Sequence, residues 1–138
     1  MTVFTLTPGP DTFVGGPGNN TVDATAATLN SDDSLTGGSG TNTLALYGGG
    51  SFYIDQLALF TGFQNIAVHD GSAQVYLGAH QSLTVTEDGS GNTTLYLGNG
   101  AVTFEAVGPY QDTIYSWDPT IWNPDDVIEG SQTRFICN

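Results

Sequence analysis

A ten-residue phrase that occurs twice near the N-terminus constrains the fold more than any other feature of this sequence. Residues 11–20 are DTFVGGPGNN and residues 33–42 are DSLTGGSGTN, so the second copy begins 22 residues after the first. A third, degraded copy, DVIEGSQT, begins at Asp126. Glycine pairs permit tight bends that other residues resist. Bends that return at a fixed interval are typical of a repetitive, coiled backbone.

Short alternating apolar runs fill the stretches between the glycines. The pairs are Ile66/Val68, Val75/Leu77, Leu83/Val85, Leu95/Leu97 and Val102/Phe104, followed by Ile114. Members two residues apart point to one face of a strand. Every second run repeats at steps of 17 and 19 residues (Ile66, Leu83, Val102) or 20 and 19 residues (Val75, Leu95, Ile114).

This near-even step predicts an all-β fold, a parallel β-solenoid of the β-roll or β-helix kind with glycine-rich turns. An antiparallel sandwich is the alternative architecture, since short strands separated by turn signals also fit it.

A length of 138 residues indicates one domain. Within it we expect a lead-in at 1–10, glycine-rich turns at 11–50 and an apolar cover at 51–64, where Ile54, Leu57 and Phe60 suit a short helical turn. Solenoid strands are expected at 65–117, and an aromatic cap and tail at 118–138.

Charge narrows the range of partners. Fourteen acidic residues stand against one basic residue, Arg134, for a formal net charge of −13. Such a field repels nucleic acid and anionic membranes, and it favours cations from solution. No run of about 18 apolar residues predicts a membrane span. The first residues, MTVFTLTPGP, lack the basic and apolar regions of an N-terminal signal peptide.

The glycine phrases resemble the nonapeptide G-G-x-G-x-D-x-U-x of the RTX, or hemolysin-type, calcium-binding repeat family, in which U is a large apolar residue. GGPGNNTVD (15–23) and GGSGTNTLA (37–45) match its three glycines and its apolar position, at Val22 and Leu44. LALFTGFQNIAVHDG (57–71) is similar to linkers of S-layer-like and other large surface proteins of bacteria.

The resemblance implies a parallel β-roll that binds Ca²⁺ between glycine turns through backbone carbonyls and carboxylates. The implied ligand residues are Asp11, Gly15, Asn20, Asp23, Asp33, Gly37 and Asn42. A hard cation needs six or more oxygens, and glycine lets carbonyls crowd that closely. Asn20 and Asn42 stand where the family has aspartate, so each site loses a formal charge and its affinity should fall.

The function implied is that of a non-enzymatic, secreted or surface-located structural module of a bacterial protein, exported without an N-terminal signal peptide. Open solenoid ends also predict self-association, as a homo-oligomer or a filament joined end to end or edge to edge.

Two further functions are compatible with the surface residues of the sequence. A carbohydrate-binding or adhesive module would use the C-terminal aromatics Tyr110, Tyr115, Trp117 and Trp122. An array of threonines (Thr84, Thr86, Thr93, Thr94 and Thr103) could bind ice, although threonine also suits any solvated strand.

The sequence contains no strong signal for a catalytic site. His69, Asp70 and Ser72 are the residue types of a hydrolase triad, but neighbours on a strand point to opposite faces. A polysaccharide lyase built on a β-helix is the remaining enzymatic alternative.

Overall fold

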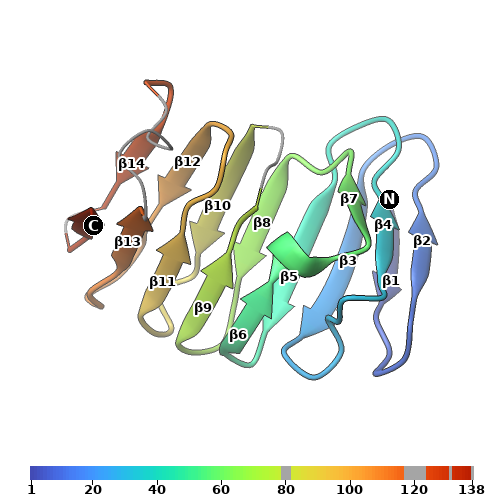
Figure 1. Ribbon diagram of the computed structural model, residues 1–138, viewed down its shortest axis with the longest axis horizontal. Coiled ribbons are helices and arrows are strands. Elements are labelled where there is room, and N and C mark those ends of the chain that lie inside the picture. The colour runs from blue at the N-terminus through green and yellow to red at the C-terminus, as the bar shows by residue number, and fades with distance from the viewer. Residues whose placement is uncertain (79–81, 117–123, 131, 138) are drawn as a thin grey trace.

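The fold is a parallel β-solenoid of about six turns, seen in a computed structural model that describes residues 1–78, 82–116, 124–130 and 132–137. All strand pairs among the described residues are parallel, which confirms the predicted fold class and excludes the sandwich. Figure 1 shows the coils stacked side by side along the long axis, with the N-terminal coils at one end and the C-terminal coils at the other.

Three sheets run along the stack. The seven-stranded sheet has the order β1 (Thr2–Thr5), β3 (Asn20–Thr25), β5 (Thr43–Tyr47), β8 (Asn65–Val68), β10 (Leu83–Glu87), β12 (Val102–Glu105) and β14 (Val127–Glu129). The five-stranded sheet has the order β6 (Gly50–Tyr53), β9 (Ala73–Tyr76), β11 (Thr93–Tyr96), β13 (Thr113–Ser116) and β15 (Arg134–Cys137). The three-stranded sheet contains β2 (Thr12–Val14), β4 (Ser34–Thr36) and β7 (Leu59–Thr61).

The cross-section of the solenoid changes along its axis. The first two coils place their strands in the seven- and three-stranded sheets, whereas the coils after β8 use the seven- and five-stranded sheets. The third coil contributes to all three, through β5, β6 and β7, with a 3-10 turn η1 (Ile54–Gln56) between the last two. The segment expected as an apolar cover therefore contains two paired strands, and its helical turn is a single 3-10 turn.

Strand register agrees with the predicted steps in one sheet and differs in the other. Val75 pairs with Leu95, and Leu95 with Ile114, as expected. Ile66 pairs with Val85 and not with Leu83, so the predicted step of 17 residues is wrong. Leu83 and Val85 both face the core from β10, and a slip of two residues keeps the same face inward. Alternation alone cannot distinguish the two registers.

The core is a set of apolar columns that run along the axis. Val22, Leu44, Ile66, Val85 and Phe104 occupy successive strands of the seven-stranded sheet, and each is completely buried. Their strand neighbours face outward and are polar or small. Each coil thus buries its inward residues against the coils before and after it, which is why the repeated step specifies the fold.

Candidate functional site

The two glycine phrases form the turns that join β2 to β3 and β4 to β5. Successive turns approach so closely that a Cβ atom on Gly15 would lie 2.0 Å from the carbonyl oxygen of Gly37. A Cβ on Gly37 would lie 2.2 Å from the carbonyl oxygen of Gly62 in the third coil. Glycine at both positions is therefore required by the spacing between coils.

Asn20 lies at the centre of a group of oxygen atoms in the first turn. Its Nδ2 is 3.2 Å from the Gly16 oxygen, 3.0 Å from the Gly18 oxygen and 3.0 Å from the Gly37 oxygen. The Oδ1 of Asn42 lies 2.8 Å from the same nitrogen. The amide of Asn20 is buried and supplies two N–H donors to these four oxygens.

Asn42 repeats this arrangement one coil later. Its Nδ2 donates to the carbonyls of Gly38, Gly40 and Gly62, at 3.3, 3.4 and 2.9 Å. Its Oδ1 also accepts the backbone N–H of Asn20, at 3.0 Å. Each asparagine therefore closes its own turn and, in the case of Asn42, fastens that turn to the preceding coil.

Gln64 is the third member of the series. Its Oε1 accepts the backbone N–H of Asn42 at 2.7 Å, and its Nε2 donates to the Gly62 oxygen at 3.3 Å. Sequence reasoning missed Gln64 because the glycine pair is absent there. A signal was present, since Gln64 follows Asn42 by the same 22 residues that separate Asn42 from Asn20.

The remaining residues of the predicted calcium site lie away from these turns. Asp11 and Asp33 stand before β2 and β4 and occupy equivalent positions, as predicted, with the backbone N–H of Asp11 donating to Asp33 Oδ1 at 2.9 Å. Asp33 Oδ2 accepts the N–H of Asn30, and Asp11 Oδ2 accepts the N–H of Thr7. Asp23 lies on β3, in the outward position opposite Ala45.

The seven predicted ligand residues therefore occupy three places. Gly15, Asn20, Gly37 and Asn42 come together at the turns, Asp11 and Asp33 bind backbone N–H groups at another corner, and Asp23 lies on an outer face. Among the residues that the structure describes, no three His, Cys, Asp or Glu side chains lie close enough to hold a metal ion together. The oxygen group at each turn consists of neutral carbonyl and amide oxygens.

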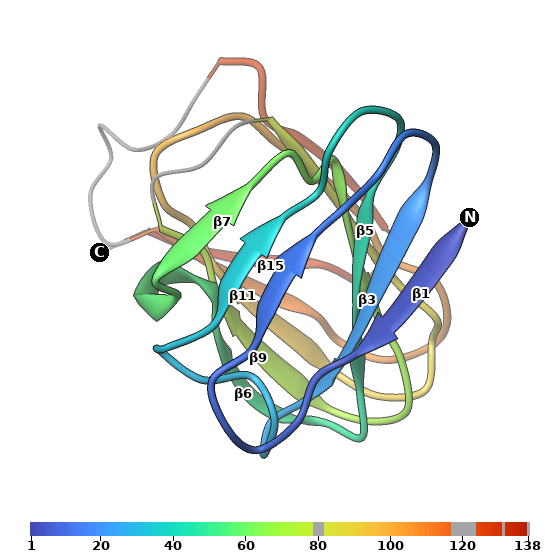
Figure 2. The same ribbon diagram turned by 90° about the vertical axis from the view of Figure 1, so that its right-hand side faces the viewer.

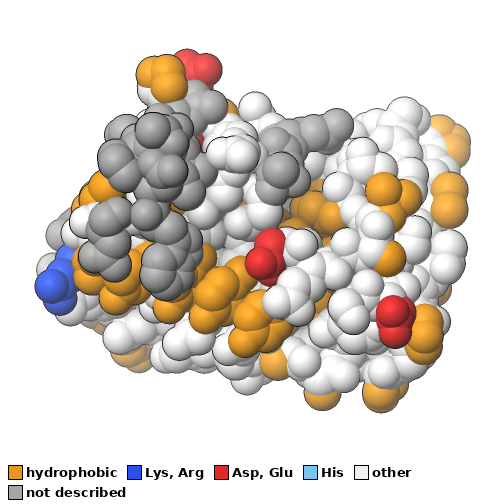
Figure 3. Space-filling view, in the orientation of Figure 1, with side chains coloured by type: hydrophobic (Ala, Val, Ile, Leu, Met, Phe, Trp, Pro, Cys, Tyr) orange, Lys and Arg blue, Asp and Glu red, His pale blue; other side chains and the backbone are white. Residues whose placement is uncertain are grey.

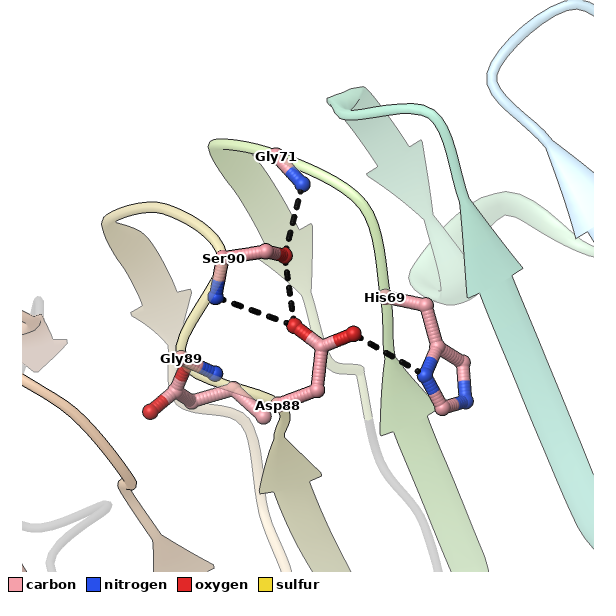
Figure 4. Close-up of polar contacts among 6 residues, drawn as sticks. His69, Gly71, Asp88, Gly89 and Ser90 are labelled. Carbon is pink, nitrogen blue, oxygen red and sulfur yellow. Dashed lines mark hydrogen bonds and ion pairs between the residues drawn. The ribbon is translucent and has the colours of Figure 1, made fainter.

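A second polar cluster joins the corners of the fourth and fifth coils (Figure 4). Asp88 accepts from the backbone N–H and the hydroxyl of Ser90, and its Oδ2 lies 3.3 Å from His69 Nδ1. These hydrogen bonds, above all that of the Ser90 hydroxyl, lower the pKa of Asp88. The aspartate lies between the serine and the histidine, so the histidine does not contact the hydroxyl it would have to deprotonate in a hydrolase. Asp70 contributes a backbone hydrogen bond to Asp88, whereas the Ser72 hydroxyl accepts the backbone N–H of Asn92.

Two buried carboxyl groups accept backbone N–H groups in the later coils, at positions outside the series Asn20, Asn42 and Gln64. Asp112 Oδ1 accepts the backbone N–H of Thr93 in the preceding coil at 2.7 Å, the role that Asn42 plays for Asn20. Glu87 accepts the N–H groups of Gly89 and Val107. Burial raises the pKa of both carboxyl groups, and for Glu87 the nearby charge of Asp112 raises it further.

The raised pKa values predict that the protein gains stability as the pH falls from 7 toward 5. A carboxyl group whose pKa is higher in the folded chain binds more protons there than in the unfolded chain, so stability decreases as pH rises through that interval. Asp112→Asn, which keeps the acceptor oxygen, should raise stability at pH 7 by on the order of 1 kcal/mol and flatten the pH dependence.

Thermal melting between pH 4.5 and 8 measures this effect. Asp32→Asn, at an exposed position, controls for the general relief of negative charge. Asp88 has the opposite effect on the pH dependence of stability. Its pKa is lowered in the folded chain, so the stability that it contributes is lost as the pH falls through that pKa. An Asp112→Asn protein that melts lower than the parent at pH 7 would contradict the prediction.

A ladder of tyrosines covers the outer face of the five-stranded sheet. The rings of Tyr53, Tyr76, Tyr96 and Tyr115 stack in order, with centroids 4.8, 4.2 and 5.1 Å apart and interplanar angles of 16°, 3° and 9°. Figure 3 shows hydrophobic side chains gathered over these strands. Of the aromatics considered for carbohydrate binding, Tyr115 belongs to the ladder, Tyr110 lies exposed in a loop, and Trp117 and Trp122 lie outside the described residues.

The threonines considered as an array do not share one surface. Thr84, Thr86 and Thr103 lie at outward positions of the seven-stranded sheet, Thr94 lies on the five-stranded sheet, and Thr93 is buried. A flat lattice of these five hydroxyls is therefore not formed.

Comparison of the chain with protein-family models, with curated proteins and with solved structures gives no match. No helix within the described ranges is both long enough and apolar enough to cross a membrane. The function must accordingly be argued from the geometry of the solenoid itself.

Proposed function

We propose that this protein is a structural module of a secreted or surface-located bacterial protein, and that it assembles with a second copy through its N-terminal coil. The observation that carries the proposal is the uncharged edge that β1 and β2 form at one end of the stack. Each of these strands has a paired neighbour on one side, β3 and β4 respectively. Figure 2 looks onto this end, with β1 in front.

The edge offers backbone groups for pairing. Thr2 and Leu6 donate their N–H groups to the second coil, at the carbonyls of Asn19 (3.2 Å) and Asp23 (2.9 Å). Because donors alternate along a strand, the N–H groups of Val3 and Thr5 point away from the second coil. Unpaired strand edges readily accept another strand, and charged residues are a common protection against this. Neither β1 nor β2 contains a charged residue.

Charge favours contact at this end. Asp11 is the only charged residue among the first 22, in a chain with a net charge of −13. Val3 and Val14 are 54% and 72% exposed there. Joining two N-terminal coils brings together the least charged ends and keeps the acidic remainder of each copy apart.

The cross-section selects a symmetric contact. The first coil has strands in the seven- and three-stranded sheets, whereas β14 and β15 belong to the seven- and five-stranded sheets. A head-to-tail contact would continue one sheet and interrupt the others. A two-fold contact pairs β1 with β1 and β2 with β2, antiparallel, so that both edges meet equal partners.

Val3→Lys is expected to weaken this association at least tenfold, because it places a charge beside the pairing edge. Sedimentation velocity over a range of concentrations measures the monomer–dimer equilibrium. Val127→Lys is the matched control, because Val127 is also an exposed valine on an end strand, β14, at the opposite end. A parent protein that stays monomeric at all concentrations, or dimers broken by Val127→Lys and not by Val3→Lys, would refute the proposal.

Adhesion to carbohydrates is the second candidate, favoured by the tyrosine ladder. Ring faces within the ladder are covered by their neighbours, so sugar stacking would use an end ring such as Tyr53, which is 44% exposed. Binding on a glycan array that Tyr53→Ala abolishes would favour adhesion over a purely structural role.

A further inference from the structure

We infer that the side-chain amides of Asn20, Asn42 and Gln64 do at these turns the work that a bound cation does in the calcium-binding repeats they resemble, so that this solenoid folds without calcium. This inference is independent of the proposed assembly.

An amide nitrogen already lies within the oxygen group of the first turn. Carbonyl oxygens that converge on one point repel each other unless a positive centre lies among them. In the first turn that centre is the Nδ2 group of Asn20, at 2.8–3.2 Å from four oxygens. These are hydrogen-bond distances, and they are longer than calcium–oxygen contacts, which measure about 2.3–2.6 Å. An ion could use the same oxygens only after the amide had left.

The oxygens around the Asn20 and Asn42 amide nitrogens are neutral carbonyl and amide oxygens. Calcium sites in proteins draw much of their affinity from carboxylates. Of the aspartates that the repeat implied, Asp11 and Asp33 accept backbone N–H groups at a different corner, and Asp23 lies at an outward position of β3. The donor set at the turns thus suits a neutral hydrogen-bond donor better than a divalent ion.

The third coil carries the same kind of amide contact. Gln64 continues the amide series with a bond to the Asn42 N–H, although its turn lacks the glycine pair. The amide series thus extends further along the solenoid than the calcium-type phrase. This indicates that fastening one coil to the next is the general role of these positions.

Melting of the parent protein in EDTA, in CaCl₂ and in MgCl₂ at equal ionic strength tests the inference directly. We expect the same melting temperature in EDTA and in CaCl₂, apart from any rise that MgCl₂ produces equally through charge screening. A melting temperature that falls in EDTA, or that CaCl₂ raises and MgCl₂ does not, would overturn the inference without any variant.

The Asn42→Asp variant tests the inference from the other side, because it replaces the amide with a carboxylate. One carboxylate oxygen retains the bonds from Asn20, while the other faces the carbonyls of Gly38, Gly40 and Gly62 with no hydrogen to donate. The variant should melt well below the parent in EDTA and should regain stability selectively with CaCl₂. Asn19→Asp adds the same charge one residue before Asn20, at an exposed position whose Oδ1 still accepts the Thr41 N–H.

If the Asn42→Asp variant melts in EDTA at the same temperature as the Asn19→Asp variant, or higher, then the Asn42 amide does not have the proposed role. The proposed dimer is tested by sedimentation of the Val3→Lys variant, and calcium-independent folding is tested by melting. Either proposal can therefore fail without affecting the other.

Discussion

Alanine in place of Gly37 is expected to lower the free energy of unfolding by about 3 kcal/mol. The new methyl carbon would lie 2.2 Å from the Gly62 oxygen, and the Gly37 N–H is bonded to Thr61 at 2.9 Å. Relief of this overlap requires the second and third coils to separate. Separation would stretch the Asn42–Gly62 bond and the pairing of β4 with β7. Denaturant unfolding followed by circular dichroism measures the loss.

Gly16→Ala is the matched control for this prediction. Gly16 belongs to the preceding glycine pair, yet a Cβ atom there would meet nothing within 4 Å. The expected change is within about 0.5 kcal/mol. Equal losses for Gly37→Ala and Gly16→Ala would mean that glycine serves backbone flexibility at these turns and that coil spacing is not the constraint.

Phe104→Ala is expected to cost about 3–5 kcal/mol. Phe104 is completely buried on β12 and lies in register between Val85 on β10 and Ile128 on β14. Its loss leaves a cavity that the flanking coils cannot fill, because their spacing is fixed by backbone hydrogen bonds. Thr103→Ala, on the outward face of the same strand, controls for strand propensity and should cost less than about 1 kcal/mol.

The position of Phe104 also predicts where the structure opens first. Solenoid coils contact mainly their neighbours, so a defect in one coil weakens the coils beside it before distant ones. Hydrogen exchange in Phe104→Ala should accelerate in β12 and β13 while β3 and β5 keep their protection. Uniform acceleration through all strands would show that the solenoid unfolds as one cooperative unit.

The sequence predicts the coil well wherever inward residues recur at a constant interval. Val75, Leu95 and Ile114 stack as expected because each is the first apolar residue of its run. The step from Ile66 fails because Leu83 and Val85 face the same way, and only pairing with a neighbouring strand distinguishes them. The tyrosine ladder was missed for a related reason: Tyr53, Tyr76, Tyr96 and Tyr115 lie at outward positions, which the inward pattern ignores.

Some contacts of the candidate site could likewise be predicted from the sequence and others could not. The repeat interval of 22 residues was sufficient to predict that Asp11 and Asp33 occupy equivalent positions. The contact between Asn20 and Asn42 of adjacent turns was not predicted. The interval was not sufficient to predict that His69 would pair with Asp88 of the next coil, because that contact depends on how two corners meet.

The period at which residue types return was enough to predict a coiled chain with inward apolar columns and glycine bends. The partners of the glycine carbonyls became evident only from the packing of the coils. Whether an amide nitrogen lies 3.0 Å from an oxygen of the next coil, as in Asn20 and Gly37, depends on the separation of residues 17 positions apart. That separation is fixed by the packing of whole coils and is not encoded in any local phrase.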